Sequence, residues 1–337
     1  MNNQPHFLKT HRKQLQKWYL ENHRPLPWRE SRDPYKVWIS EIMLQQTTTT
    51  AVVPYFERFL KKFPHLKALA SASEEDVVSA WAGLGYYSRA RNVLKSAQLF
   101  DKNGGLPSTY EELLSYPGIG PYTSRSIASI AFGQDVGVLD GNVIRVLTRF
   151  FNLAVPWWKS DSRKLLQTLA DNVVQGFPPE QINQAMMELG ATICTPTSPK
   201  CLHCPWIKSC QSYKHSFQDK LPLVKPKRQS EIWLWSPIIV TKNSNIALCK
   251  NNYAPFLKGQ WFLPGKVKRL QKPPKSFDFR HAITHHKIFV TVVSQKTLSP
   301  TKWDSDIEWV RSDKVSLWSP SSMVQKAIQQ IKTKGIY

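Results

Sequence analysis

Acidic residues, long apolar runs and glycines are all scarce in this 337-residue chain. The chain has 24 Asp and Glu against 46 Lys and Arg, a formal charge of +22. This excess favours a polyanionic partner, with nucleic acid ahead of a membrane surface. No segment approaches the ~18 consecutive apolar residues of a membrane span, and the start, MNNQPHFLKTHRKQLQKW, lacks the apolar stretch of a signal peptide. We therefore expect a cytoplasmic protein whose five cysteines are thiols or metal ligands rather than disulfides.

The charge and the hydrophobic pattern both change near residue 224. Residues 1–224 hold 26 basic and 18 acidic residues (+8), whereas residues 225–337 hold 20 and 6 (+14). The junction, LPLVKPKRQSE, is rich in proline and lysine, as linkers often are. Helical patterns fill the first part, and short β-rich runs fill the second. We expect a multidomain protein with an all-α domain (1–213), a linker (214–230) and a small α+β domain (231–337).

Capping residues predict helix boundaries in the first part. Asp33 caps and Pro34 opens a helix over PYKVWISEIMLQQ (34–46). Ser108 and Glu111 form a capping box ahead of EELLSY.

In the second part, four β-rich runs precede one amphipathic helix. The runs are EIWLWSPIIVT (231–241), NIALCK (245–250), KIFVTVVSQ (287–295) and IEWV (307–310). The helix, SSMVQKAIQQIKTK, has an apolar stripe of Val324, Ala327, Ile328 and Ile331.

The segment SYPGIGPYTSRSIASIAFG places two glycines and two prolines in a tight turn, although the chain has only 14 glycines. Pro121 starts a helix that Gly133 ends. Gly118 and Gly120 supply positive φ and let a ligand reach the main chain, and the free N–H groups of the helix start can bind a phosphate. Without a Walker lysine nearby, a DNA backbone phosphate fits better than a nucleotide triphosphate. The alternative is an ordinary helix–helix turn.

Four of the five cysteines fall in CTPTSPKCLHCPWIKSC, as Cys194, Cys201, Cys204 and Cys210. Four thiols this close in a cytosolic chain indicate a metal centre. The spacing leaves zinc and [4Fe–4S] open, and His203 could serve as a zinc ligand. We expect Cys249, in a β-rich run, to be an ordinary buried thiol.

The PGIG turn, the later VLDGNV and the cysteine spacing together resemble the endonuclease III superfamily of helix-hairpin-helix DNA glycosylases, from about Pro27 to Cys210. LPWR, YKVWISEIMLQQT, GLGYYSRARN and INQAMMELGATICT are similar to the adenine DNA glycosylase (MutY) family nearly residue for residue. The resemblance implies a [4Fe–4S] cluster on the four cysteines. It also implies a monomeric, nucleoid-associated repair enzyme that removes adenine opposite 8-oxoguanine or guanine in double-stranded DNA.

Three residues are expected to carry the chemistry. Cleavage of an N-glycosidic bond needs an acid for the departing base and a carboxylate near the sugar. Glu41 has apolar neighbours along its helix, so its pKa should be raised, as a general acid requires. Asp140 suits a helix N-cap, and the resemblance adds a role in the transition state. Tyr122 stands where endonuclease III has the lysine that forms an imine, so we expect base removal without strand cleavage.

The resemblance also assigns residues that contact DNA. Gln46 and Tyr86 wedge the duplex, and Arg29 and Gln184 line the adenine pocket. Gly118, Gly120 and Asn142 are the other residues of this domain that are expected to contact DNA. Ile144 replaces a lysine that traps the abasic product in some relatives, which should reduce lyase activity.

The second domain resembles Nudix proteins at KGQWFLPGK, but no acidic residue lies between Glu231 and Asp278. A magnesium site needs clustered carboxylates, so we expect a lesion reader rather than a pyrophosphatase. The family's Phe-Ser-His loop corresponds to Ile283, Thr284 and His285, so Thr keeps the hydroxyl while Ile replaces the aromatic ring.

Two competing functions belong to different classes. A thymine-mismatch glycosylase also has tyrosine at position 122 but generally lacks the second domain. A non-enzymatic, cluster-bearing DNA-binding protein would need neither Glu41 nor Asp140.

Overall fold

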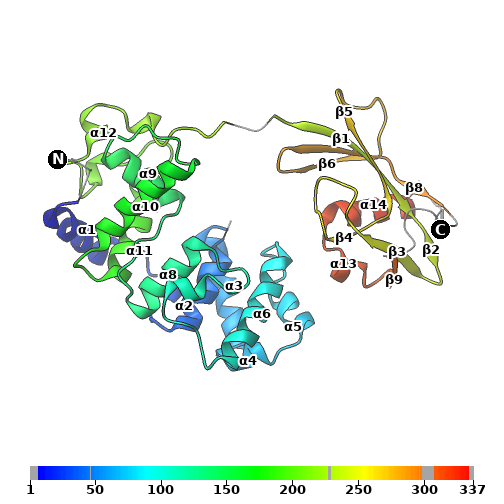
Figure 1. Cartoon of the computed structure of the whole chain (residues 1–337), viewed down its shortest axis with the longest axis horizontal. Helices are drawn as coiled ribbons and strands as arrows, with labels where there is room; N and C mark the ends of the chain where they lie inside the picture. Colours follow the sequence, from blue (N-terminus) through cyan, green and yellow to red (C-terminus); the bar gives the residue numbers. More distant parts are fainter. Residues whose placement is uncertain (1–6, 46, 227–228, 296, 298–306, 334–337) are drawn as a thin grey trace. The chain divides into compact units, whose positions relative to one another are not determined.

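The computed structural model describes residues 7–45, 47–226, 229–295, 297 and 307–333. The chain forms two compact units, Met1–Lys225 and Pro226–Tyr337 (Figure 1). The first is helical and the second is built from short strands with two helices, which confirms the predicted all-α domain followed by a small α+β domain. Within the described residues, no helix has both the length and the apolar character to cross a membrane.

The helical unit contains twelve α-helices in its described part. They are α1 (Lys9–Asn22), α2 (Pro34–Leu44), α3 (Thr49–Lys62), α4 (Leu66–Ala70), α5 (Glu74–Ala80), α6 (Tyr87–Lys102), α7 (Tyr110–Leu113), α8 (Pro121–Phe132), α9 (Gly141–Phe150), α10 (Ser160–Val174), α11 (Pro179–Thr192) and α12 (Gln211–Lys214). Short 3-10 turns lie at Pro27–Arg29, Cys201–His203 and Gln218–Lys220.

Two hydrophobic cores stabilise this unit. One is built from α2 to α8 and includes the fully buried Trp38, Trp81 and Phe100. The other is built from α1, α9, α10 and α11, with Trp206 from the cysteine loop. Met187 of α11 packs against both cores. At the boundary between the two cores, α2 and α8 therefore lie on one side and α9 and α11 on the other.

Helix α2 begins as the capping residues predict. The Asp33 carboxylate accepts the backbone N–H groups of Tyr35 and Lys36, and Pro34 occupies the first helical position. The helix ends at Leu44, because Gln45 is already extended, so the prediction of a helix to residue 46 is too long. Gln46 itself lies outside the described residues.

The N-cap of α7 lies one residue later than predicted. Thr109, with extended backbone, accepts the N–H of Glu112, and its hydroxyl donates to the Glu112 carboxylate at 2.7 Å. The choice of Ser108 and Glu111 was wrong because two hydroxyl residues precede two glutamates, and the pattern fits either register.

The helical unit continues past residue 213 to Lys225. The Leu221 carbonyl accepts a hydrogen bond from Arg149 Nε at 2.9 Å, and the Leu223 carbonyl accepts one from Trp157 Nε1 at 2.9 Å. Leu221 is buried. These contacts fix the segment after α12 to the helices.

The second unit contains strands β1 (Glu231–Ile239), β2 (Thr241–Lys242), β3 (Asn245–Lys250), β4 (Trp261–Phe262), β5 (Gly265–Leu270), β6 (Phe279–Ile283), β7 (His286–Val290), β8 (Val293–Ser294) and β9 (Ile307–Arg311). One sheet has the order β5-β1-β7-β6, with β8 also paired to β1, and the other has the order β2-β3-β4, with β9 paired to β3. Helices α13 (Val315–Trp318) and α14 (Ser322–Thr333) follow, and α14 buries its predicted apolar stripe against the sheets.

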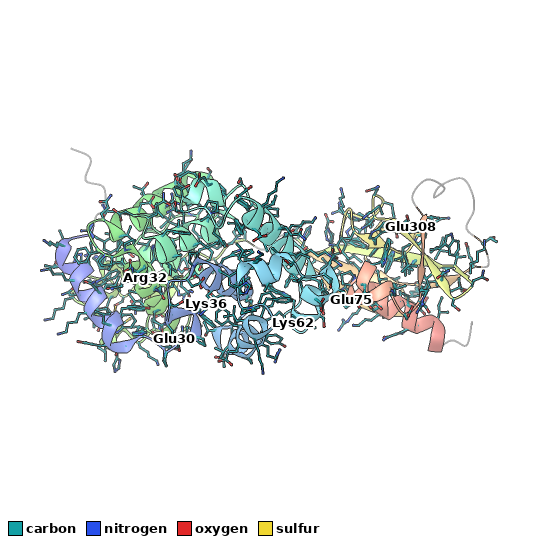
Figure 2. All side chains as sticks on the ribbon, turned by 90° about the horizontal axis from the view of Figure 1, so that it is seen from below. Glu30, Arg32, Lys36, Lys62, Glu75 and Glu308 are labelled. Carbon is teal, nitrogen blue, oxygen red and sulfur yellow. The ribbon has the colours of Figure 1, made fainter. Side chains whose placement is uncertain are left out.

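The predicted strands are present but shorter and more numerous. The runs at 231–241 and 287–295 are each divided between two strands, and β4, β5 and β6 were missed. Adjacent basic residues, Lys268-Arg269 in β5 and Arg280-His281 in β6, interrupt the apolar pattern of these short strands. Charged side chains cover both units; Figure 2 labels Arg32, Lys36 and Lys62 on the helical unit and Glu308 on β9.

Candidate active site and metal centre

A pocket of about 190 Å³ opens on the helical unit where its two cores meet. It brings together residues from α2, α8, α9 and α11, more than a hundred positions apart in the sequence. Its polar lining includes Arg24, Arg29, Ser40, Glu41, Thr47, Thr49, Tyr122, Asp140, Asn142, Gln184 and Glu188. The predicted catalytic residues and the predicted adenine-pocket residues therefore share one cavity.

Glu41 enters this pocket from the middle of α2. Its side chain is buried, with Val37 and Leu44 beside it in the pocket wall. Burial raises the pKa of Glu41 to about 7, although the nearby hydroxyls of Tyr122 and Ser126 lower it in part. The Glu41 Oε2 atom has no hydrogen-bond partner of good geometry. Near neutral pH, this carboxyl can therefore hold a proton and has an oxygen free for a ligand.

Tyr122, at the start of α8, lies beside Glu41. Its hydroxyl hydrogen-bonds the Glu41 carboxyl, which lowers the Glu41 pKa in part, and it also lies 3.3 Å from Met187 Sδ. Burial and the charges of Glu41 and Asp140 raise the pKa of Tyr122 well above its ordinary value. The phenol therefore keeps its proton and gives the pocket a neutral donor.

Asp140 caps α9, as predicted. One carboxylate oxygen accepts the Val143 N–H at 2.7 Å, and the other accepts the Asn142 amide at 2.8 Å. Burial raises the pKa of Asp140, while these hydrogen bonds act in the opposite direction. Asn142 is held in turn by Arg145, which donates to its Oδ1 at 2.7 Å. The cap thus fixes the carboxylate in the pocket wall.

Glu188 of α11 was missed by the sequence analysis. It is buried and accepts Arg24 Nε at 2.7 Å and Arg29 Nη2 at 2.8 Å. Burial opposes its ionisation, but the two arginines outweigh burial and lower the pKa of Glu188. The signal was the same as for Glu41: a single carboxylate among apolar helix residues, in MMELG. This triad holds Arg29, whose side chain lines the pocket with Arg24.

Gln184, one turn before Glu188, also lines the pocket. Its carbonyl oxygen accepts the Tyr19 hydroxyl at 3.2 Å, and its amide donates to the Glu180 carbonyl at 3.0 Å. These bonds hold its amide in one orientation at the pocket wall.

The four clustered cysteines line a second, smaller pocket together. A tetrahedral zinc with sulfur ligands at about 2.3 Å separates those sulfurs by about 3.8 Å. Among the described residues, no three of these four Sγ atoms lie within 4.8 Å of one another. The four thiols share this pocket but are not drawn together as closely as the ligands of a bound zinc ion. His203, the alternative zinc ligand, is exposed and does not line this pocket.

The surroundings of the cysteines are basic and rigid. Arg149 Nη1 contacts Cys194 Sγ at 3.4 Å, and Arg145 Nε donates to the Cys194 carbonyl at 2.7 Å. Burial raises the pKa of the Cys204 thiol to about 12. Thiolate ligands here would need a bound positive centre, and the arginines fit the negative charge of a thiolate-bound cluster. Cys249 is buried, as expected.

Comparison with known proteins places the chain in a family. Residues 39–173 match the model of HhH-GPD superfamily base excision DNA repair proteins. An adenine DNA glycosylase of Buchnera aphidicola subsp. Baizongia pistaciae is 30% identical over 320 residues, which cover 90% of this chain and 86% of that protein. The chain belongs to the adenine DNA glycosylase family. This confirms the resemblance found in the sequence, and the family's enzymes are hydrolases of N-glycosyl bonds.

Two further similarities concern shorter parts of the chain. The adenine DNA glycosylase of Rattus norvegicus is 44% identical over 221 residues, 62% of this chain and 43% of the rat protein. The chain thus spans less than half the length of that relative. The solved structure of a thermostable thymine-DNA glycosylase has a TM-score of 0.56 at 28% identity, covering 61% of this chain and 98% of that one.

The sequence analysis predicts that the PGIG turn and Tyr86 of this chain contact DNA. Gly118 has φ +79°, as predicted, and a Cβ there would meet Asn92 Cβ at 2.9 Å. Gly120 was predicted to need positive φ as well, but it is extended and caps α8. Tyr86 has a left-handed backbone (φ 51°), and its side chain is 61% exposed. An exposed ring on a fixed backbone suits contact with bases.

The predicted lesion-reading residues form the turn between β6 and β7. Ile283 and His286 pair across it, so Thr284 and His285 are the two turn residues. Thr284 is exposed with φ 53°, and its Oγ1 lies 3.2 Å from His285 Nδ1. The turn thus presents both polar side chains next to each other.

Proposed function

We propose that this chain removes adenine hydrolytically from double-stranded DNA, where adenine lies opposite 8-oxoguanine or guanine, and leaves the strand intact. The observation that supports this most is the buried Glu41 carboxyl, with its unpartnered oxygen and its pKa raised to about 7. It lines the same pocket as the carboxylate of Asp140. The proposal includes action as a monomer on nucleoid DNA in the cytoplasm.

In this mechanism, Glu41 donates its proton to the departing adenine, which becomes a better leaving group. Asp140 stabilises the positive charge that develops on the sugar as the glycosidic bond lengthens. Water then attacks the sugar cation and gives up a proton to the Glu41 carboxylate, which restores the acid. The Glu188 triad holds Arg29 against the extruded base, beside Gln184.

The nucleophiles in the pocket support base removal without strand cleavage. Arginines line the pocket, but no lysine is among its described lining residues, so no amine there can form an imine with the sugar. Tyr122, which lies next to Glu41, has a phenol and no amine. Ile144 is buried in the second core and offers no amine.

Recognition of the duplex is divided among several elements in this proposal. Tyr86, together with Gln46, fills the space left by the flipped base. The backbone at Gly118 and Gly120, before α8, binds a phosphate. In the second domain, Thr284 and His285 read the 8-oxoguanine. In this proposal the helical domain carries the chemistry and the domain 231–337 reads the lesion.

The [4Fe–4S] cluster in this proposal is held by Cys194, Cys201, Cys204 and Cys210. When bound, it supplies binding free energy that orders the loop between α11 and α12. Purified protein should then be brown and contain four irons per chain. Anaerobically prepared protein containing zinc and no iron would contradict the assignment.

Single-turnover excision assays test the function. The substrates are four duplexes, with adenine or thymine opposite guanine or 8-oxoguanine. We expect release of adenine from both adenine duplexes and no strand break before alkali treatment. Release of thymine alone would indicate a thymine-mismatch glycosylase, and binding without release would indicate a non-enzymatic DNA-binding protein.

A further inference from the structure

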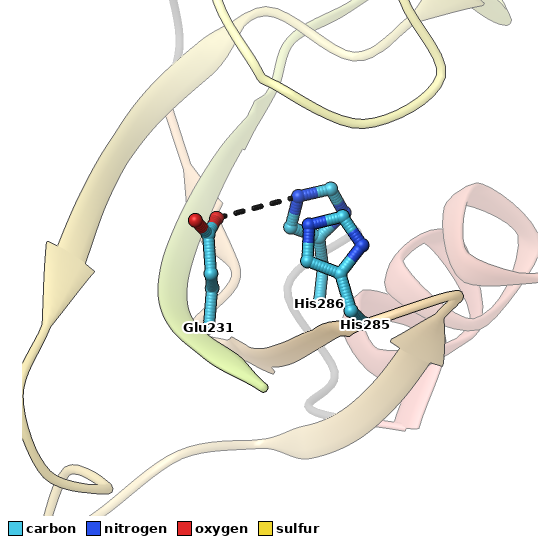
Figure 3. A group of neighbouring side chains, drawn as sticks. All are labelled: Glu231, His285 and His286. Atoms are coloured by element: carbon cyan, nitrogen blue, oxygen red, sulfur yellow. Dashed lines mark ion pairs between the residues drawn. The ribbon is translucent and has the colours of Figure 1, made fainter. Parts of the chain in front are cut away.

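Three potential metal ligands of the second unit meet at one end of its larger sheet. They are Glu231, the first residue of β1, His286, the first residue of β7, and His285 in the turn before it (Figure 3). One ligand atom from each lies within 4.8 Å of the other two. Parallel pairing of Glu231 with His286, and a hydrogen bond from Glu231 N to the His285 carbonyl at 2.9 Å, fix the three backbones together.

We propose that Glu231, His285 and His286 bind a borderline divalent cation of the zinc type. Two imidazoles and one carboxylate are the donor set of many zinc sites with an open fourth position. His286 Nε2 and Glu231 Oε2 are 3.4 Å apart. Ligand atoms at 2.0–2.1 Å from a tetrahedral zinc are separated by about 3.3–3.4 Å, so this pair needs almost no movement.

The His286 ring is buried with one nitrogen facing the carboxylate. His286 is 8% exposed, and its Nδ1 atom is buried without a hydrogen-bond partner of good geometry. Its Nε2 atom is the one that lies next to Glu231. The ring is therefore positioned to offer Nε2 to a metal.

The charges around the cluster define how the carboxylate can bind. Arg269 Nη2 contacts Glu231 Oε1 at 3.1 Å, and Trp233 Nε1 donates to Oε2 at 3.0 Å. Oε2, which lies next to His286, is the oxygen that can ligate a metal, while Oε1 stays paired with Arg269. A magnesium or calcium ion would need several more carboxylates, and the sequence has none between Glu231 and Asp278. The site is thus specific to metals that accept imidazole.

A bound metal would tie the β6–β7 turn to the start of β1. His285 would then give a ring nitrogen to the metal, which restricts the orientation of its side chain beside Thr284. Metal occupancy would therefore couple to any contact that His285 makes with another molecule. The metal site itself does not depend on the proposed glycosylase activity.

Zinc chloride titrated into the full-length, iron-loaded protein tests the site. Calorimetry gives the stoichiometry and affinity, and zinc-edge X-ray absorption gives the ligand type. We expect one zinc per chain with nitrogen and oxygen at about 2.0–2.1 Å and no sulfur at about 2.3 Å. His285→Ala and Glu231→Gln should each weaken zinc affinity roughly tenfold or more. Both residues are partly exposed, so these variants spare the buried His286.

His281→Ala is the matched control, because His281 lies on β6 of the same hairpin but outside the cluster. It should bind zinc like the unchanged protein. Sulfur ligands in the absorption spectrum would place the zinc on the cysteines and overturn the proposal. Equal affinity in all three variants, or no stoichiometric binding, would overturn it as well.

Discussion

The pocket in the helical unit and the β6–β7 turn in the sheet unit use polar groups in opposite ways. Glu41 is buried on a helix, and loss of water raises its pKa to about 7. Thr284 is exposed on a two-residue turn with φ 53°. Proton transfer needs a group with a shifted pKa, and burial provides the shift. Reading a partner needs accessible donors and acceptors, and a tight turn provides them. The difference follows from the chemistry each region has to perform.

Glu41→Gln should have the largest effect. The amide keeps the shape of the side chain but has no acidic proton for the departing base, so excision should fall by about 10²–10⁴-fold or more. Binding of the duplex should persist. Single-turnover rates and a binding titration on the same duplex measure the two quantities. A variant with normal excision would show that the acid lies elsewhere in the pocket.

The same variant should raise stability at alkaline pH. Because the folded pKa of Glu41 is about 7 and its ordinary value is 4.5, the unfolded chain loses this proton first as pH rises. The free energy of unfolding therefore decreases between pH 4.5 and 7, by about 3 kcal/mol from this group. Glu41→Gln removes that decrease. Denaturant unfolding at pH 8 should show a more stable variant, and at pH 4.5 this difference should vanish.

Excision should follow the same titration, because only protonated Glu41 is the acid. The rate should decrease as pH rises above about 7. A rate that stays constant well above that pH would argue against Glu41 as the acid.

His285→Ala tests the turn rather than the pocket. Adenine removal opposite guanine should be nearly unchanged, while the preference for 8-oxoguanine over guanine should drop roughly ten- to a hundredfold. The preference is the ratio of the two single-turnover efficiencies, with His281→Ala as control. An intact preference would move lesion recognition to the helical unit, with Tyr86 the first residue to change.

Gly190→Ala tests how rigid the pocket wall is. A Cβ at Gly190 of α11 would lie 2.6 Å from Asn142 Cβ and 3.0 Å from Asn142 Cα, and Asn142 holds Asp140. We expect a loss of about 1–3 kcal/mol in stability and slower excision. Gly141→Ala is the matched control, since a Cβ there meets nothing within 4 Å. Equal stability of the two variants would mean that the pocket wall shifts enough to accommodate the added methyl group.

Thr284→Gly should have the smallest effect, and it should stabilise the protein where Gly190→Ala destabilises it. A β-branched residue at φ 53° is strained, and glycine accepts this conformation. The free energy of unfolding should increase by up to about 1 kcal/mol, measured by denaturant unfolding. A loss of stability would show that the Thr284 hydroxyl holds the turn through His285.

Local signals predicted much of this molecule. Asp33 and Pro34 fixed the start of α2, and the apolar neighbours of Glu41 predicted its raised pKa. Ser108 and Thr109 could not be distinguished, because either hydroxyl satisfies the same capping pattern. The ion pairs of Glu188 were missed because Arg24 lies 164 residues away in the sequence and meets it only in the folded chain.

The two cores of the helical unit divide the proposed catalytic pair between them: Glu41 belongs to the helices of one core, and Asp140 to the start of α9 in the other. A small shift of one core against the other would change the separation of the two carboxyls without altering either residue. We therefore expect substitutions deep in the packing, such as at the α9–α11 contact, to reduce the proposed excision in a protein that still folds. A search for substitutions that abolish the activity should therefore include residues at the boundary between the two cores as well as residues of the pocket.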